Sequence, residues 1–348
     1  MKTRAAIYVE SGQPIVIDDV ELPDPGPTQV LVKQFATGVC HSQLHQLHNP
    51  ATRTPLLLGH ESTGLVTARG SLVTHVKEGD HVMLTFMLRD PHAHVEVPKV
   101  KYRGQEILAP AGSSTWAEDV IFDQNFVVPL DPEVPTDVTS VIGCAVMTGC
   151  GAALNTAGVR AGDSVAVFGV GGVGLCIVQA CANANCYPII AVDLADDKLD
   201  YAEKFGATHG VNAARENAVA RIRELAAGGA DFAFDAIGVP STMEQLLPAV
   251  RPGQRGLRPE GGTAVLVGVP RGEPKIPMRE IFQAKVYKGS AGGGSRPDRD
   301  FPMYVRWYKA GKLPLDLLVT KRYKLEEVNE ACAALAQGEI LGRAILEL

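Results

Sequence analysis

The stretch Ser164-Val-Ala-Val-Phe168, followed by Gly169-Val-Gly171-Gly172-Val173-Gly174, decides the fold of this chain. Five uncharged residues lead into a cluster of glycines, and an apolar run of helical character continues to about residue 184. A second apolar run over 189–192 ends at Asp193. The order of strand, glycine turn, helix, strand and acid predicts a parallel β-α-β unit that holds a dinucleotide.

Three glycines of this turn have separate tasks in such a unit. Gly169 permits the tight turn, Gly171 lets the backbone approach a pyrophosphate, and Gly174 lets the helix pack closely on the strand. The helix N-terminus then binds the phosphates. A β-α-β crossover without a ligand is the competing interpretation, but Asp193 stands where a carboxylate accepts hydrogen bonds from the adenosine ribose. Because this carboxylate would repel a 2′-phosphate, we expect NAD rather than NADP.

Length and composition limit the class of protein. A chain of 348 residues suggests two domains, and 46% hydrophobic with 21% charged residues is typical of a globular protein. The net charge of −6 and the lack of a basic stripe disfavour nucleic acid as a partner. We expect no signal peptide and no membrane span, since glycines interrupt the apolar run 166–182. Seven cysteines without a C-x-x-C pair indicate reduced thiols in a cytoplasmic protein.

The pattern of predicted secondary structure changes twice along the chain. Antiparallel strands are predicted in the first part, at 15–17, 30–32, 64–66 and 81–84. Regular strand–helix alternation follows from 160 to about 290, with further strands at 232–237 and 264–268, and predicts a doubly wound sheet. The last stretch is mixed, with helices at 303–310 and 325–336 and a strand at 343–348. We expect the C-terminal segment to rejoin the first domain.

The first part of the chain holds the candidate chemistry. Cys40, His60 and Cys144 could form a Cys₂His zinc site with an open fourth position, which is the pattern of catalytic zinc. Taken singly, a cysteine is more often a small buried hydrophobe and a histidine more often a hydrogen-bonded core residue. Spacing alone does not join the three.

Longer motifs show that the chain resembles the zinc-dependent medium-chain alcohol dehydrogenases over essentially its full length. The matching segments are Gly38-Val-Cys40-His-Ser42-Gln-Leu-His45, Gly59-His60-Glu61-Ser-Thr-Gly64, Gly79-Asp80-His-Val82, Ile142-Gly-Cys144-Ala-Val-Met-Thr148-Gly149, Val167-Phe-Gly169-Val-Gly-Gly-Val-Gly174, Asp193 with Lys198, and Gly342-Arg343-Ala-Ile-Leu346. Tyr102-Arg-Gly104 and Ser113-Ser-Thr115 are similar to the liver-type branch.

The resemblance implies an α/β architecture in which a Rossmann domain, a doubly wound parallel sheet, is inserted into a mostly antiparallel, GroES-like catalytic domain. The implied boundaries are 1–146 with 292–348 for the catalytic domain and 147–291 for the NAD-binding domain. The implied activity is reversible hydride transfer between NAD and a primary or secondary alcohol. The implied partners are a small alcohol or carbonyl substrate and further copies of the chain, as a homodimer or homotetramer.

The same resemblance gives each site residue an expected role. Cys40, His60 and Cys144 would bind zinc, and Glu61 is the acidic neighbour that can approach the metal. Ser42 and His45 would relay the hydroxyl proton to solvent. Phe86 would form an aromatic wall of the pocket, which favours an apolar or aromatic alcohol. The expected cofactor contacts are His41, Thr148, Gly169, Gly171, Gly172, Val173, Gly174, Asp193, Lys198, Val269 and Arg343.

Two departures from the family stand out. The family commonly carries a four-cysteine lobe for a structural zinc, but residues 87–101 contain no cysteine, so we expect one zinc per chain. Gln43 occupies a position where the family usually has Asp, whose carboxylate supports the zinc-binding histidine. Losing such a partner typically costs about 10–100-fold in metal affinity or activity.

The second departure leaves two alternatives open. One is a zinc-poor, NAD(P)H-dependent reductase of the same fold that acts on a C=C or C=N bond. The other is a nucleotide-binding structural or regulatory protein without turnover. The three ligand positions together with Ser42 and His45 favour the alcohol dehydrogenase, since a protein without alcohol chemistry need not retain all five.

Overall fold

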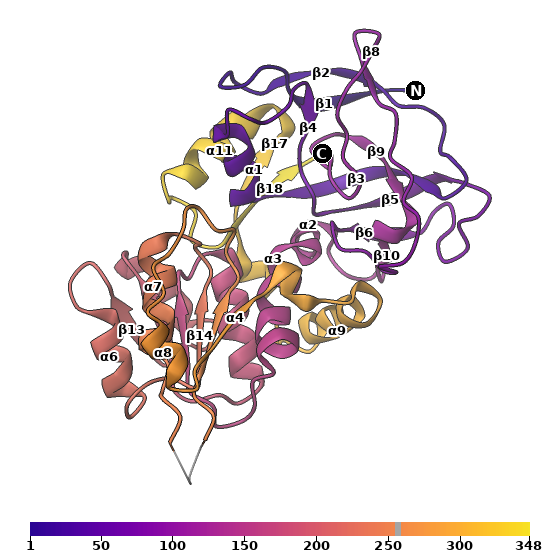
Figure 1. The fold of residues 1–348 in the computed structure, drawn as a ribbon. Coiled ribbons are helices and arrows are strands. Elements are labelled where there is room, and N and C mark those ends of the chain that lie inside the picture. Colours follow the sequence, from indigo (N-terminus) through magenta and orange to yellow (C-terminus); the bar gives the residue numbers. More distant parts are fainter. Residues whose placement is uncertain (255–258) are drawn as a thin grey trace. The chain divides into compact units, whose positions relative to one another are not determined.

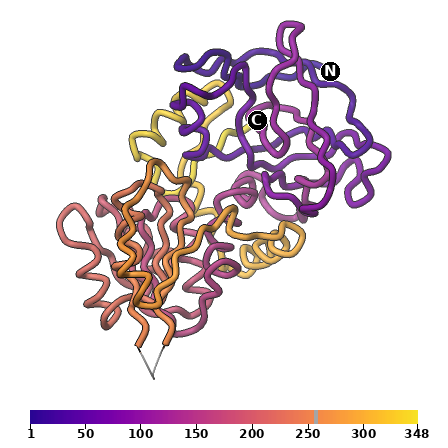
Figure 2. Tube along the Cα trace, in the orientation of Figure 1, coloured from indigo at the N-terminus to yellow at the C-terminus, as the bar shows by residue number. Residues whose placement is uncertain are grey.

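The computed structural model describes residues 1–254 and 259–348 as two compact units. Unit 1 comprises Met1–Cys144 and Arg296–Leu348, and unit 2 comprises Ala145–Ser295. Both termini lie in unit 1, where the last segment of the chain, drawn in yellow, returns to the first segments, drawn in indigo (Figures 1 and 2).

Unit 1 is built on two sheets. In the described residues one sheet has the order β4-β1-β2-β7-β8, and the other has the order β10-β6-β5-β3-β18-β17 with β9 paired to β3. All pairs are antiparallel except β17 with β18. The strands are β1 (Lys2–Tyr8), β2 (Val16–Glu21), β3 (Gln29–Val39), β4 (Leu56–Leu57), β5 (Ser62–Arg69), β6 (His81–Leu84), β7 (Lys101–Tyr102), β8 (Gln105–Glu106), β9 (Asp119–Asp123), β10 (Val127–Pro129), β17 (Val319–Lys324) and β18 (Arg343–Glu347).

Short helices complete unit 1. The α-helices are α1 (His41–His48), α2 (Thr136–Thr139), α9 (Pro297–Lys309), α10 (Leu315–Leu318) and α11 (Val328–Ala336), and the 3₁₀ helices are η1 (Gln124–Phe126), η2 (Ser140–Gly143) and η5 (Leu325–Glu327). A buried apolar cluster around Trp116 joins α1 and α11 to the sheet, and Trp116 itself is fully buried. The C-terminal segment is therefore part of the core of unit 1.

Unit 2 is one parallel sheet with helices on both faces (Figure 1), as the sequence predicts. Its strand order is β13-β12-β11-β14-β15-β16, so the direction of the winding reverses between β11 and β14. Strands and helices are β11 (Val165–Phe168), β12 (Ile189–Asp193), β13 (His209–Asn212), β14 (Phe232–Asp235), β15 (Thr263–Leu266), β16 (Val286–Gly289), α3 (Ala145–Gly151), the π-helix η3 (Ala152–Ala157), α4 (Gly172–Asn183), α5 (Asp196–Glu203), α6 (Ala218–Leu225), α7 (Pro240–Ala249), α8 (Met278–Phe282) and the 3₁₀ helix η4 (Ala291–Gly294).

The central strand β11 lies where its sequence predicts. All four of its residues are buried, as expected for a strand covered on both faces, and it pairs in parallel with β12 and β14. The strand expected at 232–237 ends at Asp235, because the Asp235 carboxylate accepts hydrogen bonds from the N–H groups of Ile237 and Gly238 and turns the chain.

Two expected helices differ from the prediction at their starts. The helix expected at 303–310 begins six residues earlier, at Pro297, because proline is well suited to the first helical position. Its second proline, Pro302, lies inside the helix, just before the predicted start. The helix expected at 325–336 opens with a 3₁₀ turn, and its α-helical part begins at Val328.

The segment that replaces the cysteine lobe is attached to the sheet by hydrogen bonds. The Thr28 hydroxyl lies 3.0 Å from Glu96 Oε2 and 2.7 Å from Asp123 Oδ2. The backbone N–H of Glu96 donates to the same Asp123 oxygen at 3.0 Å. This part of the chain is thus connected to unit 1 by direct polar contacts.

No single helix in residues 1–254 and 259–348 is long and apolar enough to cross a membrane. The helical segments Thr136–Gly143 and Ala145–Ala157 reach that length and hydropathy only when they are counted together, and the chain bends by 54° between them.

Substitution of the third glycine of the turn should destabilise unit 2. A Cβ at Gly174 would collide with the carbonyl oxygen of Gly169, whereas a Cβ at Gly171 would meet no atom within 4 Å. We predict that Gly174→Ala lowers the free energy of unfolding by about 1–3 kcal/mol. The matched variant Gly171→Ala, at the helix N-cap, should lower it by less than about 1 kcal/mol. Urea unfolding of both variants checks this, and equal effects would contradict the packing argument.

Candidate active site

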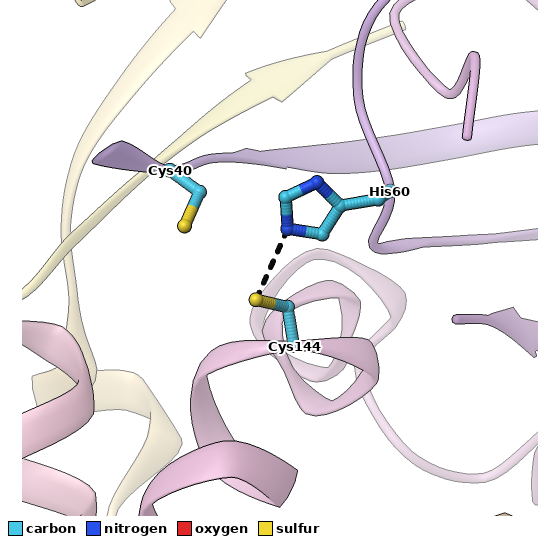
Figure 3. Close-up of side chains that lie close together, drawn as sticks. All are labelled: Cys40, His60 and Cys144. Carbon is cyan, nitrogen blue, oxygen red and sulfur yellow. Dashed lines mark hydrogen bonds between the residues drawn. The ribbon is translucent and has the colours of Figure 1, made fainter. Parts of the chain in front are cut away.

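Cys40, His60 and Cys144 lie together in unit 1, with their ligand atoms within 4.8 Å of one another. His60 Nε2 is 3.1 Å from Cys144 Sγ, and Figure 3 shows that the same ring nitrogen also faces the side on which the Cys40 sulfur lies. Both cysteines are buried and His60 is partly buried. Two thiolates and an imidazole are the donors of a catalytic zinc site with an open fourth position, so the residues present fit this metal.

Close backbone packing brings the three ligands together. Cys40 follows β3 as the N-cap of α1, His60 precedes β5, and Cys144 follows η2. A Cβ at Gly38 would collide with the Glu61 side chain, and a Cβ at Gly143 would collide with the carbonyl oxygen of Leu84. Glycine at these two positions therefore permits the approach of the ligand-bearing segments.

A buried hydrogen-bond network fixes the segment around His60. The Thr37 hydroxyl donates to the carbonyl oxygen of Glu61 at 2.8 Å and lies 2.7 Å from the Thr115 hydroxyl. The Ser113 hydroxyl donates to the carbonyl oxygen of Gly59 at 2.8 Å, and the indole N–H of Trp116 donates to that of Gly38 at 3.0 Å. These contacts give the Ser113–Trp116 segment a positioning role that the sequence motif alone did not define.

The electrostatic surroundings favour the metal-binding form of Cys40. The hydrogen bond with Cys144 lowers the pKa of the Cys40 thiol well below its ordinary value, although burial opposes this shift. The positive charge of Arg343 and the contact with His60 lower it further. Because the thiolate is the form that binds metal, the site is prepared for a cation.

Glu61 and Arg343 form a buried ion pair beside this cluster. The Glu61 side chain is fully buried and that of Arg343 is 5% exposed. The family resemblance implies separate roles for these two residues, toward the metal and toward the cofactor pyrophosphate. The pairing of β3 with both β5 and β18 explains why they meet.

Gln43 contacts two parts of the same site. It is the third residue of α1, and its Oε1 accepts a hydrogen bond from the backbone N–H of Cys40 at 2.9 Å. Its Nε2 lies 2.5 Å from His60 Nδ1. Gln43 is thus the direct neighbour of the candidate metal ligand His60, at the position where the family resemblance predicts Asp.

The expected relay and pocket residues lie on or near α1. Ser42 is the second residue of this helix, and its hydroxyl oxygen is buried without a hydrogen-bond partner among residues 1–254 and 259–348. His41 and His45 lie on the same helix, exposed and half-buried respectively. The Phe86 ring stands edge-on to the His60 ring, with centroids 5.2 Å apart, and is 36% exposed.

The expected cofactor residues of unit 2 gather at the C-terminal ends of the parallel strands. The Asp193 carboxylate accepts hydrogen bonds from the N–H groups of Val170, at 3.0 Å, and Leu194, at 2.8 Å, so it lies against the glycine turn. Helix α4 begins at Gly172 without a side-chain cap. Its first N–H groups therefore remain available to an anion.

The remaining cofactor candidates of unit 2 lie on separate elements. Thr148, on α3, has a buried hydroxyl that contacts no hydrogen-bonding partner in the described part of the chain. Val173 lies in the first turn of α4, and Lys198 is half-buried on α5. Val269 follows β15 and is 52% exposed.

Comparison with known proteins places this geometry in a family. Residues 26–132 match the alcohol dehydrogenase GroES-like domain, and residues 172–310 match the zinc-binding dehydrogenase domain. The chain is 34% identical to the class-3 alcohol dehydrogenase of Cereibacter sphaeroides, covering 99% of this chain and 100% of the relative. The chain belongs to the zinc-dependent medium-chain alcohol dehydrogenases.

Other members of this family agree in sequence and fold. The NDMA-dependent alcohol dehydrogenase of Amycolatopsis methanolica is 35% identical, with 99% of both chains covered. The crystal structure of benzyl alcohol dehydrogenase from Acinetobacter calcoaceticus superposes with a TM-score of 0.89 at 27% identity, covering 100% of this chain and 99% of that one. The predicted architecture, a Rossmann domain inserted into a GroES-like domain, is confirmed.

The buried ion pair should be a strong determinant of stability. We predict that Glu61→Gln or Arg343→Met alone lowers the free energy of unfolding by about 3–5 kcal/mol, because each leaves an uncompensated buried charge. The double variant should lose less than the sum of the two. As a control, Asp196→Asn breaks the exposed pair with Arg215 and should cost at most about 1 kcal/mol. Additive losses in denaturant unfolding would contradict a direct Glu61–Arg343 interaction.

Proposed function

We propose that this protein is a zinc- and NAD-dependent alcohol dehydrogenase. The observation that carries the proposal is the convergence of Cys40, His60 and Cys144, whose ligand atoms lie within 4.8 Å of one another. Membership of the alcohol dehydrogenase family supports it. Zinc bound there would polarise the alcohol oxygen as a Lewis acid, and NAD would accept the hydride.

Residues of unit 1 would remove the hydroxyl proton of the alcohol and line its pocket. The buried Ser42 hydroxyl, which has no hydrogen-bond partner within residues 1–254 and 259–348, is suited to accept the hydroxyl proton of an alcohol. His45, three residues further along α1, would pass that proton to solvent, because imidazole exchanges protons near neutral pH. Phe86 would form an apolar wall next to His60.

Residues of unit 2 would hold NAD. The N–H groups at the start of α4 would bind the pyrophosphate, and Gly171 leaves room for its approach, since no atom lies within 4 Å of a Cβ there. The Asp193 carboxylate would accept hydrogen bonds from the adenosine ribose and would repel a 2′-phosphate. Thr148, whose buried hydroxyl has no partner among the described residues, would contact the nicotinamide together with Val173 and Val269, and Lys198 would contact the ribose. The family resemblance also gives His41 and Arg343, which belong to unit 1, a role toward the pyrophosphate.

The proposed substrate is an apolar or aromatic primary or secondary alcohol. The exposed Phe86 ring beside His60 supports an aromatic wall, and a benzyl alcohol dehydrogenase is among the similar structures. Relatives named S-(hydroxymethyl)glutathione dehydrogenase, from Candida maltosa and Paracoccus denitrificans, make that thiol adduct the main competing substrate.

Zinc analysis combined with turnover tests the proposal. We predict about one zinc per chain and NAD reduction with benzyl alcohol, at a higher kcat/KM than with NADP. Ser42→Ala should keep the zinc but lower kcat by about 10²–10⁴-fold, because it removes the proton acceptor. Cys144→Ser should lose zinc and activity together.

Each other outcome has a distinct meaning. Zinc-free protein that binds NADH and oxidises no alcohol after zinc is added back would favour the reductase of a C=C or C=N bond. Nucleotide binding without any turnover would favour a regulatory protein. Equal or better use of NADP would refute the role of Asp193. Preference for S-(hydroxymethyl)glutathione over benzyl alcohol would keep the enzyme class and change the substrate.

We further propose that two copies of the chain associate through unit 2, in the cytoplasm. Strand β16 is the last in its sheet, and no other described strand covers its outer edge. Near it, Phe282 is 90% and Met278 71% exposed, and an open apolar edge favours pairing with another copy. All seven cysteines are free thiols, which supports a reducing compartment, and cell fractionation checks this location.

Sedimentation velocity tests the association. We predict a dimer or tetramer for the native chain and a smaller species for Phe282→Glu, because a charge at this exposed apolar position opposes burial. Leu72→Glu is the matched control, since Leu72 is 62% exposed on unit 1, and it should leave the assembly unchanged. A native monomer, or equal effects of both variants, would contradict the interface.

A further inference from the structure

The amide group of Gln43 has a defined orientation, because one of its two neighbours can only donate. The backbone N–H of Cys40 lies 2.9 Å from one end of the amide, and a backbone N–H has no acceptor capacity. The atom that faces it must therefore be the oxygen, Oε1. The other end, the NH₂ group, then faces His60 Nδ1 at 2.5 Å. Gln43 is 1% exposed, so water does not compete for these contacts.

This orientation defines the proton position on His60. The Gln43 NH₂ group can only donate, so His60 Nδ1 must accept, and a neutral His60 carries its proton on Nε2. His60 Nε2 lies 3.1 Å from Cys144 Sγ, so this proton points at the sulfur. In this arrangement the Gln43 NH₂ group faces an acceptor, His60 Nδ1, and the His60 Nε2–H group faces an acceptor, Cys144 Sγ.

Metal binding requires the opposite arrangement. His60 Nε2 is the ring nitrogen that faces the two sulfurs, and it must present a lone pair to a metal, which moves the proton to Nδ1. Two donors, Nδ1–H and the Gln43 NH₂ group, would then face each other. Rotation of the amide would relieve this contact but would place the NH₂ group against the Cys40 N–H. One amide oxygen in this position cannot accept from both donors, whereas a carboxylate has two oxygens and can.

We propose that Gln43 is a positioning residue that holds His60 in the Nε2–H tautomer and thereby weakens the affinity of the Cys40–His60–Cys144 site for zinc. The inference rests on the proposed function for the identity of the metal. It attributes the weaker zinc affinity to a conflict between two hydrogen-bond donors at His60 Nδ1, and not to the negative charge that Gln43 lacks. A glutamate of the same length at position 43 would remove that conflict.

The tautomer of His60 is measured first, on metal-free native protein. Long-range ¹H–¹⁵N correlation of ¹⁵N-histidine-labelled protein, with His60 assigned by its absence from His60→Asn, should show a proton on Nε2 and none on Nδ1. Metal-free Gln43→Glu should show the proton on Nδ1. A native protein with the proton on Nδ1 would overturn the proposal without reference to any variant.

Zinc affinity is measured next, by titration with Zn²⁺ against a chelator and without substrate. We expect Gln43→Glu to bind about 10–100-fold more tightly than the native chain. Gln43→Met, which removes the obstructing donor, should bind zinc at least as tightly as the native chain. If Gln43 instead supports His60 as an ordinary acceptor, Gln43→Met would bind zinc more weakly than the native chain and Gln43→Glu would gain nothing.

A control variant distinguishes the effect of the His60 tautomer from electrostatic attraction between an added carboxylate and Zn²⁺. Gln46→Glu adds the same charge three residues further along α1, at a half-buried side chain. It should change zinc affinity much less than Gln43→Glu, and an equal gain would overturn the proposal. Absence of alcohol turnover would refute the proposed enzyme but leaves both readouts valid, because neither uses substrate.

Discussion

The hydrogen-bonded pairing of β3 with β5 and β18 is the constraint on which the site of unit 1 depends. In this register Thr37 lies opposite Ser62 and Val39 lies opposite Ala344. The residues next to these pairs are Cys40, Glu61 and Arg343, so three segments distant in the sequence deliver a metal ligand, a carboxylate and a guanidinium to one place. Since strand register is fixed by the buried face of the sheet, the chemistry of the site is a consequence of core packing.

The sequence predicted the fold of unit 2 well because its signals are local. The glycine turn and Asp193 lie within one β-α-β unit, and each has a steric or hydrogen-bonding reason that is visible in the sequence. The ends of elements were less predictable where a proline is compatible with a helix, as at Pro302. The strand that ends at Asp235 depends on a side-chain turn that apolar patterning does not reveal.

Unit 1 is different because its site depends on contacts between distant segments. Cys40, His60 and Cys144 were joined by resemblance to a family, since isolated cysteines and histidines carry no spacing signal. The Glu61–Arg343 pair required the sheet register, and the direction of the Gln43 amide required the position of the Cys40 N–H. A hydrogen-bond donor has no signature in composition or periodicity, so the conflict at His60 could be found only in three dimensions.

The return of the C-terminal strand to unit 1 also has a consequence for biosynthesis. Unit 2 is continuous in sequence, so a ribosome can release all of it before β18 has been made. Unit 1 must then wait for β18, and its buried pair of Glu61 with Arg343 can form only after Arg343 has emerged from the exit tunnel. The segment made first is therefore completed after unit 2, and the cluster of Cys40, His60 and Cys144 acquires the charge of Arg343 only at that late stage.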